Sequence, residues 1–363
     1  MIENFDIKVL VEPALSWFIE HKRELPWRMN RDPYRIWVSE IMLQQTRVEA
    51  VKPYYDRFMT ELPSIAALAE CSEDRLLKLW EGLGYYSRVR NMNKAARQIV
   101  EEYQGEMPHT YEEIVKLPGI GPYTAGAIAS IAFEEAVPAV DGNVLRIISR
   151  VTEDDSDILK DATKKKVSRA LLEVMPQGQS GAFNQALMEI GATVCVPNGM
   201  PKCQECPWHE LCQARIHGTI EFFPVKTKAK ERRIEEKTVL IIRDGEKIAL
   251  GKRPAKGLLA GLYELPNLEG HLSEENVLDY TREQGLLPLQ IKKLPDAKHI
   301  FSHVEWHMTG YMIYVADVDT VSETSPNGNY ILTEIDTIQQ EYPIPAAFEK
   351  YVELVNISIG MKK

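Results

Sequence analysis

The stretch LPGIGPYTAGAIASIAF, residues 117–133, contains the turn and the helix start on which the predicted fold depends. Gly119 and Gly121 permit the left-handed or closely packed backbone of a tight turn, and Pro122 suits the first position of the next helix. The stretch therefore predicts a helix–hairpin–helix. Exposed N–H groups at such a helix N-terminus can hold a DNA phosphate. A plain connection between two helices is the alternative.

The sequence on either side of this turn predicts a chain of more than one domain. Apolar residues recur at three- and four-residue spacing from residue 8 to about 217, which is typical of helices. A polar, basic stretch (PVKTKAKERRIEEK, 224–237) then indicates a linker. Beyond it, two strand-like runs flank Asp244-Gly245, a hairpin signal, and helical and strand-like segments alternate up to one amphipathic C-terminal helix expected from about Pro345 to Val355. We predict an all-α domain over 1–217, a linker over 218–237 and an α+β domain over 238–363.

Composition limits the kinds of partner. The 363 residues exceed what one hydrophobic core usually supports, and the sequence contains neither an apolar run of about 18 residues nor a signal peptide. We expect a cytoplasmic protein with no membrane contact. A net charge of −10 argues against coating nucleic acid by bulk positive potential. DNA binding would instead be local, through basic residues such as Arg88 and through backbone N–H groups.

Four of the five cysteines are clustered as Cys195-x7-Cys203-x2-Cys206-x5-Cys212. Such clustering in a chain without a signal peptide indicates metal ligation rather than disulfides. The close spacing favours a four-iron, four-sulfur (4Fe–4S) cluster. A zinc site is the alternative, but zinc sites more often pair two CxxC units across a longer gap, and only Cys203 and Cys206 form such a unit.

Two carboxylates are candidates for acid–base chemistry. Glu40, in RIWVSEIMLQQTR, shares a helix face with Ile36 and Trp37, so burial would raise its pKa toward the range of a general acid. The alternative is a glutamate at the edge of the stripe that reaches solvent. Asp141, in PAVDGNVLRI, immediately precedes a predicted helix, and an ordinary N-cap is the alternative to a catalytic role.

Together, the hairpin, Asp141 and the four cysteines resemble the helix–hairpin–helix DNA glycosylase superfamily, in its endonuclease III branch, over residues 8–217. Within that branch SEIMLQQT (39–46), GLGYYSR (82–88) and VDGNV (140–144) resemble the MutY adenine DNA glycosylases. The cysteine motif departs from the family by one residue, since seven residues rather than six separate its first two ligands. The resemblance implies a monomeric, nucleoid-associated enzyme that removes adenine mispaired with 8-oxoguanine or guanine in double-stranded DNA.

The resemblance also implies roles in catalysis. Glu40 would protonate adenine N7, and Asp141 would stabilise the oxocarbenium-like sugar. Asn143 and Tyr123 would orient Asp141 and the nucleophile. Tyr123 occupies the place where bifunctional members have a lysine, and a phenol cannot form a Schiff base, so the enzyme would be monofunctional and would not cut the strand.

DNA contacts are implied in both domains. Gln45 and Tyr85 would fill or support the base stack when adenine is flipped out, although Tyr85 could instead be an ordinary core aromatic. The C-terminal domain resembles the Nudix-related domain of MutY proteins but lacks the glutamate pattern that binds Mg²⁺ in Nudix hydrolases. It would therefore read damage, through Phe301, Ser302 and His303, which match the family's 8-oxoguanine loop.

Two rival interpretations explain fewer residues. An endonuclease III-like glycosylase acting on oxidised pyrimidines is disfavoured by Tyr123 and by the extra domain. A non-catalytic DNA-binding or electron-transfer iron–sulfur protein would need neither Glu40 nor Asp141. Metal binding by His299, His303 and His307 is also disfavoured, because four-residue spacing does not converge in strand-like sequence.

Overall fold

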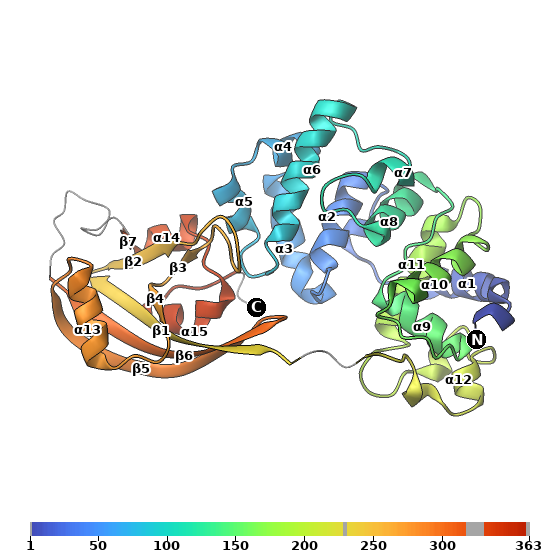
Figure 1. Ribbon diagram of the computed structural model, residues 1–363. Helices are drawn as coiled ribbons and strands as arrows, with labels where there is room; N and C mark the ends of the chain where they lie inside the picture. The colour runs from blue at the N-terminus through green and yellow to red at the C-terminus, as the bar shows by residue number, and fades with distance from the viewer. Residues whose placement is uncertain (1, 228–230, 317–329, 361–363) are drawn as a thin grey trace. The chain divides into compact units, whose positions relative to one another are not determined.

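The computed structural model describes residues 2–227, 231–316 and 330–360 (Figure 1). The chain forms two compact units. The first comprises Met1–Glu70 and Asn91–Ala229, and the second comprises Cys71–Arg90 and Lys230–Lys363. A short segment from the N-terminal half of the sequence thus belongs with the C-terminal residues.

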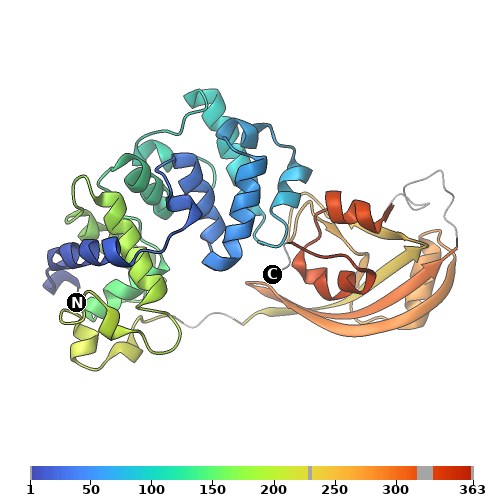
Figure 2. The same cartoon turned by 180° about the vertical axis from the view of Figure 1, so that it is seen from behind.

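The first unit is helical. One of its cores combines apolar residues of α1, α9 and α11, and Figure 2 shows α12 beside α9. Local sequence sets the helix starts: Asp32 caps α2 by accepting a hydrogen bond from the Tyr34 N–H (2.8 Å), and Pro33 is the first helical residue. The helices are α1 (Val11–His21), α2 (Pro33–Leu43), α3 (Val48–Glu61), α4 (Ile65–Glu70), α7 (Tyr111–Ile114), α8 (Pro122–Phe133), α9 (Gly142–Thr152), α10 (Asp161–Leu172), α11 (Ser180–Thr193) and α12 (Gln213–Ile216), while α6 (Ser87–Tyr103) begins in the second unit and ends in the first.

The predicted helix–hairpin–helix is formed by α7 and α8. Gly119 has φ +75°, and a Cβ there would lie only 2.5 Å from the Cβ of Asn91, so the turn requires glycine for its conformation and for space. Gly121 is the N-cap of α8, and Pro122 is its first residue. Both turn glycines are exposed, which leaves the start of α8 open to a ligand.

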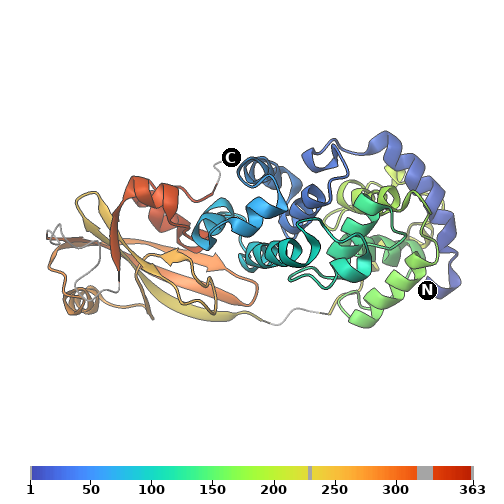
Figure 3. The same ribbon diagram turned by 90° about the horizontal axis from the view of Figure 1, so that it is seen from above.

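The second unit is built on a mixed sheet of order β3-β2-β1-β6-β5, in which β4 also pairs with β1 and β7 with β2. The parallel pair β1–β6 forms its centre, and β5–β6 is an antiparallel hairpin. Alternate residues of β1 contribute to separate cores on the two faces, and Figure 3 shows α13 and α15 on opposite sides of the sheet. The elements are α5 (Glu73–Leu79), β1 (Arg233–Asp244), β2 (Lys247–Lys252), β3 (Tyr263–Glu264), β4 (Asn267–Glu269), α13 (Glu274–Glu283), β5 (Pro288–Ile300), β6 (Val304–Val315), β7 (Ile331–Glu334), α14 (Ile335–Glu341) and α15 (Glu349–Val352).

The structure differs from the sequence expectations at two places. β1 begins at Arg233, within the basic stretch expected to be a linker, because β6 supplies a parallel partner from Val304 onward. The C-terminal segment, expected to be one helix from about residue 345, consists of α15 between two short 3₁₀ turns. Among the described residues, no helix is both long and apolar enough to cross a membrane.

Candidate active site and cysteine pocket

Glu40 lies on α2 with only 6% of its surface exposed. The Tyr123 hydroxyl, on α8, donates a hydrogen bond to Glu40 Oε2 at 2.6 Å. Burial raises the pKa of Glu40 to about 7, and the charge of Asp141 adds to this effect, while the Tyr123 hydrogen bond and the Arg28 charge oppose it. The carboxyl group is therefore partly protonated near neutral pH, as a general acid must be.

Asp141 is the N-cap of α9 and half-buried. Its Oδ1 accepts hydrogen bonds from the backbone N–H groups of Asn143 (2.9 Å) and Val144 (2.8 Å), and its Oδ2 accepts one from Asn143 Nδ2 (2.7 Å). Burial raises the pKa of Asp141, but these N–H donors and the Arg146 charge counteract it. Because the partners of both oxygens are N–H donors, we assign the carboxylate form. The N-cap expected as the alternative is thus present, and it sets the position of the carboxylate.

A group of charged residues beside Glu40 was missed by the sequence analysis. Glu189, on α11, is almost fully buried and is paired with Arg23 (2.5 Å) and Arg28 (2.8 Å). The pair holds Arg28 where its charge lowers the pKa of Glu40. The available signal was a glutamate inside the apolar helix sequence AFNQALMEIGA.

Arg146, also missed, connects Asp141 to the cysteine segment. Its Nη2 donates to Asn143 Oδ1 (2.8 Å), while its Nε donates to the carbonyl of Cys195 (2.9 Å). The Asn143 amide that orients Asp141 is therefore itself oriented by a buried guanidinium. An arginine three residues after Asn143, on an otherwise buried helix, was the signal for it.

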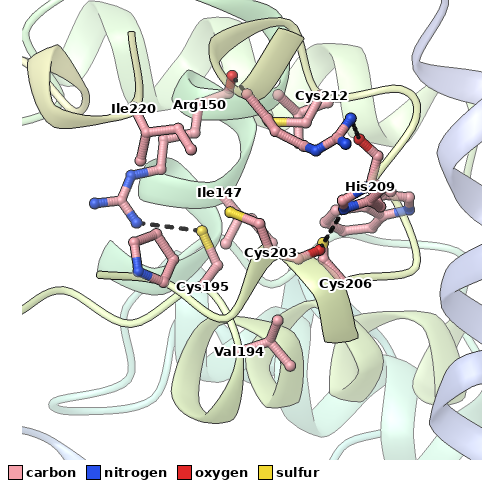
Figure 4. Close-up of a pocket in the computed structure, with 13 residues that line it drawn as sticks. Ile147, Arg150, Val194, Cys195, Cys203, Cys206, His209, Cys212 and Ile220 are labelled. Atoms are coloured by element: carbon pink, nitrogen blue, oxygen red, sulfur yellow. Dashed lines mark hydrogen bonds between the residues drawn. The ribbon is translucent and has the colours of Figure 1, made fainter. Parts of the chain in front are cut away.

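The four predicted metal ligands line one pocket, shown in Figure 4: Cys195, Cys203, Cys206 and Cys212. Arg150 Nη1 lies 3.3 Å from Cys195 Sγ, which brings a positive charge to the thiol. Burial raises the pKa of Cys206 to about 12, so its thiolate form needs a cationic partner. Among the residues that the structure describes, no three ligand side chains converge tightly enough to hold a single metal ion.

The predicted DNA contacts of the first unit lie on its surface. Gln45, two residues after the end of α2, is exposed and has φ +59°, a left-handed conformation that is rare for a residue other than glycine. Such strain is often retained at functional sites. Gly119 and Gly121 are exposed at the α7–α8 turn.

The predicted DNA contacts of the second unit include a side-chain pair. Tyr85 is 48% exposed, has φ +47°, and its hydroxyl lies 2.9 Å from Ser302 Oγ. Ser302 and His303 are exposed, and Phe301 packs edge-on against Trp306, with ring centroids 5.0 Å apart. The core position considered for Tyr85 is therefore wrong.

Arg88 supports the turn that contains Tyr85. Its Nη2 donates to the carbonyls of Leu83 and Gly84, both at 3.0 Å, and burial lowers its pKa to about 10. A DNA contact by Arg88 stays a prediction.

Two sequence families match this chain. The HhH-GPD superfamily of base excision DNA repair proteins matches residues 38–177, and the NUDIX domain matches residues 238–354. An adenine DNA glycosylase of Mus musculus is 35% identical, over 90% of this chain and 74% of the mouse protein. One of Buchnera aphidicola subsp. Baizongia pistaciae is 32% identical, over 94% of this chain and 96% of the relative. The solved structure of a thermostable thymine-DNA glycosylase superposes on 58% of this chain and 96% of its own, with TM-score 0.52 and 28% identity.

The helix–hairpin–helix fold and these matches define a DNA N-glycosylase of base excision repair. The chain belongs to the MutY-type adenine DNA glycosylase family. The expected order, a helical glycosylase domain followed by a Nudix-like domain, is confirmed. The rival interpretation, a glycosylase that acts on oxidised pyrimidines, is set aside, because the two relatives that match at least 90% of this chain are adenine DNA glycosylases.

The raised pKa of Glu40 predicts that ionisation of its carboxyl group lowers the free energy of unfolding. Between the ordinary value of 4.5 and about 7, the folded state binds more protons than the unfolded state, so stability falls as pH rises through this window. Glu40→Gln removes this loss, and we expect it to raise the free energy of unfolding at pH 8 by up to about 3 kcal/mol. Urea unfolding of both proteins from pH 4 to 8 measures it; a difference that does not grow with pH would contradict the assignment.

Proposed function

We propose that Glu40 is the general acid and Asp141 the electrostatic stabiliser in the excision of adenine. This proposal rests on the buried carboxyl group of Glu40, which is hydrogen-bonded to Tyr123 and whose pKa is raised by the charge of the nearby Asp141. Two carboxyl groups with unlike environments, one protonated and one ionised, are what cleavage of a glycosidic bond requires.

Each group has a defined task in this scheme. Glu40 donates its proton to adenine N7, so the base leaves neutral when its bond to the sugar breaks, and the Asp141 carboxylate stabilises the positive charge that develops on the sugar. Water then adds to the sugar and loses a proton to the Glu40 carboxylate, which restores the acid. Asn143 holds Asp141 in place through its backbone and side-chain N–H groups. Tyr123 fixes the Glu40 carboxyl and cannot form a Schiff base, so the strand stays intact.

The proposed roles predict the loss of turnover in two conservative variants. In a duplex with one A:8-oxoguanine pair, Asp141→Asn and Glu40→Gln should each lower the single-turnover rate by about 10²–10⁴-fold, because each loses its charge or its proton. Cleavage at the adenine after alkali measures the rate. The matched control is Asp6→Asn, which changes an N-cap aspartate of a 3₁₀ turn in the same unit and should leave the rate near that of the wild type. A near wild-type rate for Asp141→Asn would remove Asp141 from the chemistry.

We further propose that the cysteine pocket holds a 4Fe–4S cluster. Each iron of such a cluster takes one thiolate, so four cysteines surrounding a pocket supply the full ligand set. A zinc site is the alternative, but zinc sites more often pair two CxxC units, and only Cys203 and Cys206 form such a unit. The proposed residues are Cys195, Cys203, Cys206 and Cys212.

A bound cluster predicts brown protein with broad visible absorption, and with equal amounts of iron and acid-labile sulfide. Cys206→Ser should lose most of both, whereas Cys71→Ser, outside the pocket, should retain them. Metal and sulfide analysis of the purified proteins decides this point. Colourless folded protein with one zinc per chain would contradict the cluster.

We also propose that double-stranded DNA with 8-oxoguanine opposite adenine is the preferred substrate, and that the loop Phe301–His303 reads the lesion. The Ser302 hydroxyl is exposed and is held by Tyr85, so its remaining hydrogen-bonding capacity faces outward. 8-Oxoguanine differs from guanine in a donor at N7 and an oxygen at C8, which a hydroxyl and nearby backbone groups can recognise.

This assignment predicts a change in preference. Ser302→Ala with His303→Ala should lower the preference for A:8-oxoguanine over A:G by the equivalent of about 1–3 kcal/mol, since one or two hydrogen bonds are lost. Rates and duplex affinities for both mispairs measure the ratio. His271→Ala with Ser273→Ala makes the same changes elsewhere in the unit and is the control. An unchanged ratio in the loop variant would place lesion reading elsewhere.

Other expectations stay predictions: the domain bounds 1–217, 218–237 and 238–363, the monomeric state, and action in the cytoplasm on nucleoid DNA. Gln45, Gly119 and Gly121 stay candidate DNA contacts.

A further inference from the structure

A buried ion pair lies at the end of α5 in the second unit. Lys78 Nζ and Glu81 Oε2 are 2.9 Å apart, and the two side chains are 14% and 5% exposed. Lys78 Nζ also donates to the carbonyls of Ile338 (3.3 Å) and Tyr342 (3.1 Å), near the end of α14. The excision scheme uses neither residue.

Glu81 completes the contact with the C-terminal residues. Its Oε1 accepts a hydrogen bond from the Ile344 N–H at 2.7 Å, and the Gly360 backbone donates a further one. Burial raises the pKa of Glu81, and Lys78 and these N–H groups oppose the rise. A buried pair contributes little net stability but demands one geometry, because its remaining donors and acceptors must all be satisfied.

The residues that follow Glu81 form a rigid turn. Trp80 Nε1 donates to the Gly84 carbonyl at 3.0 Å, and the Arg88 guanidinium binds the same carbonyl from the other end of the turn. Gly84 and Tyr85 both have positive φ. Tyr85 therefore has little freedom within the turn, and its place in the unit depends on how Glu81 is held.

The partner of Tyr85 lies on a second rigid element. Ser302 is in the tight connection between β5 and β6, where the Phe301 N–H donates to the Val304 carbonyl at 2.8 Å. Phe301 packs on Trp306, which packs in turn on Phe348 of the core. Because the turn that contains Tyr85 and the β5–β6 connection are each held by internal contacts, the distance between Tyr85 and Ser302 depends on the position of α5 relative to the C-terminal residues.

We propose that Lys78 and Glu81 are positioning residues for recognition of the base opposite adenine. They hold α5 against the C-terminal residues so that the Tyr85 hydroxyl lies within hydrogen-bond distance of Ser302. This inference rests on the proposed lesion-reading role of the Phe301–His303 loop. It assigns specificity to two residues that do not themselves touch the DNA.

The test compares kcat/KM for A:8-oxoguanine and A:G duplexes in Glu81→Gln and in Lys78→Met. Each should lower the ratio of the two values by about fivefold or more, the effect of losing one to two hydrogen bonds. A variant that is merely less stable loses active enzyme equally for both duplexes, so its ratio does not move. Asp74→Asn is the control, since it breaks a half-exposed ion pair between the same helix and Lys252, and the ratio should hold.

A double-mutant cycle with Ser302→Ala tests the route of the effect. If Glu81 acts through the Tyr85–Ser302 contact, Glu81→Gln should lower the ratio no further once Ser302 is alanine. Should Glu81→Gln fail to fold, Lys78→Met combined with Glu81→Leu replaces the pair by apolar side chains and is measured in its place. A wild-type ratio in the folded variants, or additive losses in the cycle, overturns the positioning role. A wild type without any preference for 8-oxoguanine would instead overturn the proposed substrate.

Discussion

The hydrogen bond from the Tyr123 hydroxyl holds the buried carboxyl group of Glu40 between two packed helices. It joins α8, whose start is set by the hairpin glycines, to α2, whose start is set by Asp32. Burial raises the pKa of Glu40 to about 7, as the proposed general acid requires, and it also makes the anion unfavourable, so the stability that the protonated form retains is lost between pH 4.5 and about 7. Function and stability oppose each other at this residue.

A second constraint acts from the other side of the site. In the proposed scheme Asp141 is ionised although it is half-buried, and the N-terminus of α9 provides the N–H groups that stabilise the carboxylate. Asn143 adds a side-chain donor, and Arg146 holds Asn143 while reaching the backbone of Cys195. The Arg146 guanidinium thereby connects the cysteine segment to the residue that holds the Asp141 carboxylate.

The sequence predicts the features that short, local patterns encode. The hairpin, the capping aspartate and the cysteine run are short-range signals, and the Asp244-Gly245 turn identified β1 and β2. Glu189 with its two arginines could not be found in this way, because its partners lie more than 160 positions away and only packing brings them together. The membership of Cys71–Arg90 in the second unit was equally hidden, since that segment has the helical periodicity of its neighbours.

Because residues 71–90 belong to the second unit, the C-terminal part of the sequence is not by itself a complete structural unit. A fragment beginning near residue 231 would lack α5 and would leave the backbone groups at 338–344 without the lysine and glutamate that now satisfy them. Joining the two parts of different homologues at the intervening segment alone would therefore separate these backbone groups from their own partners. A productive chimera would have to transfer residues 71–90 with the C-terminal sequence, so recombination among relatives is constrained at two junctions rather than one.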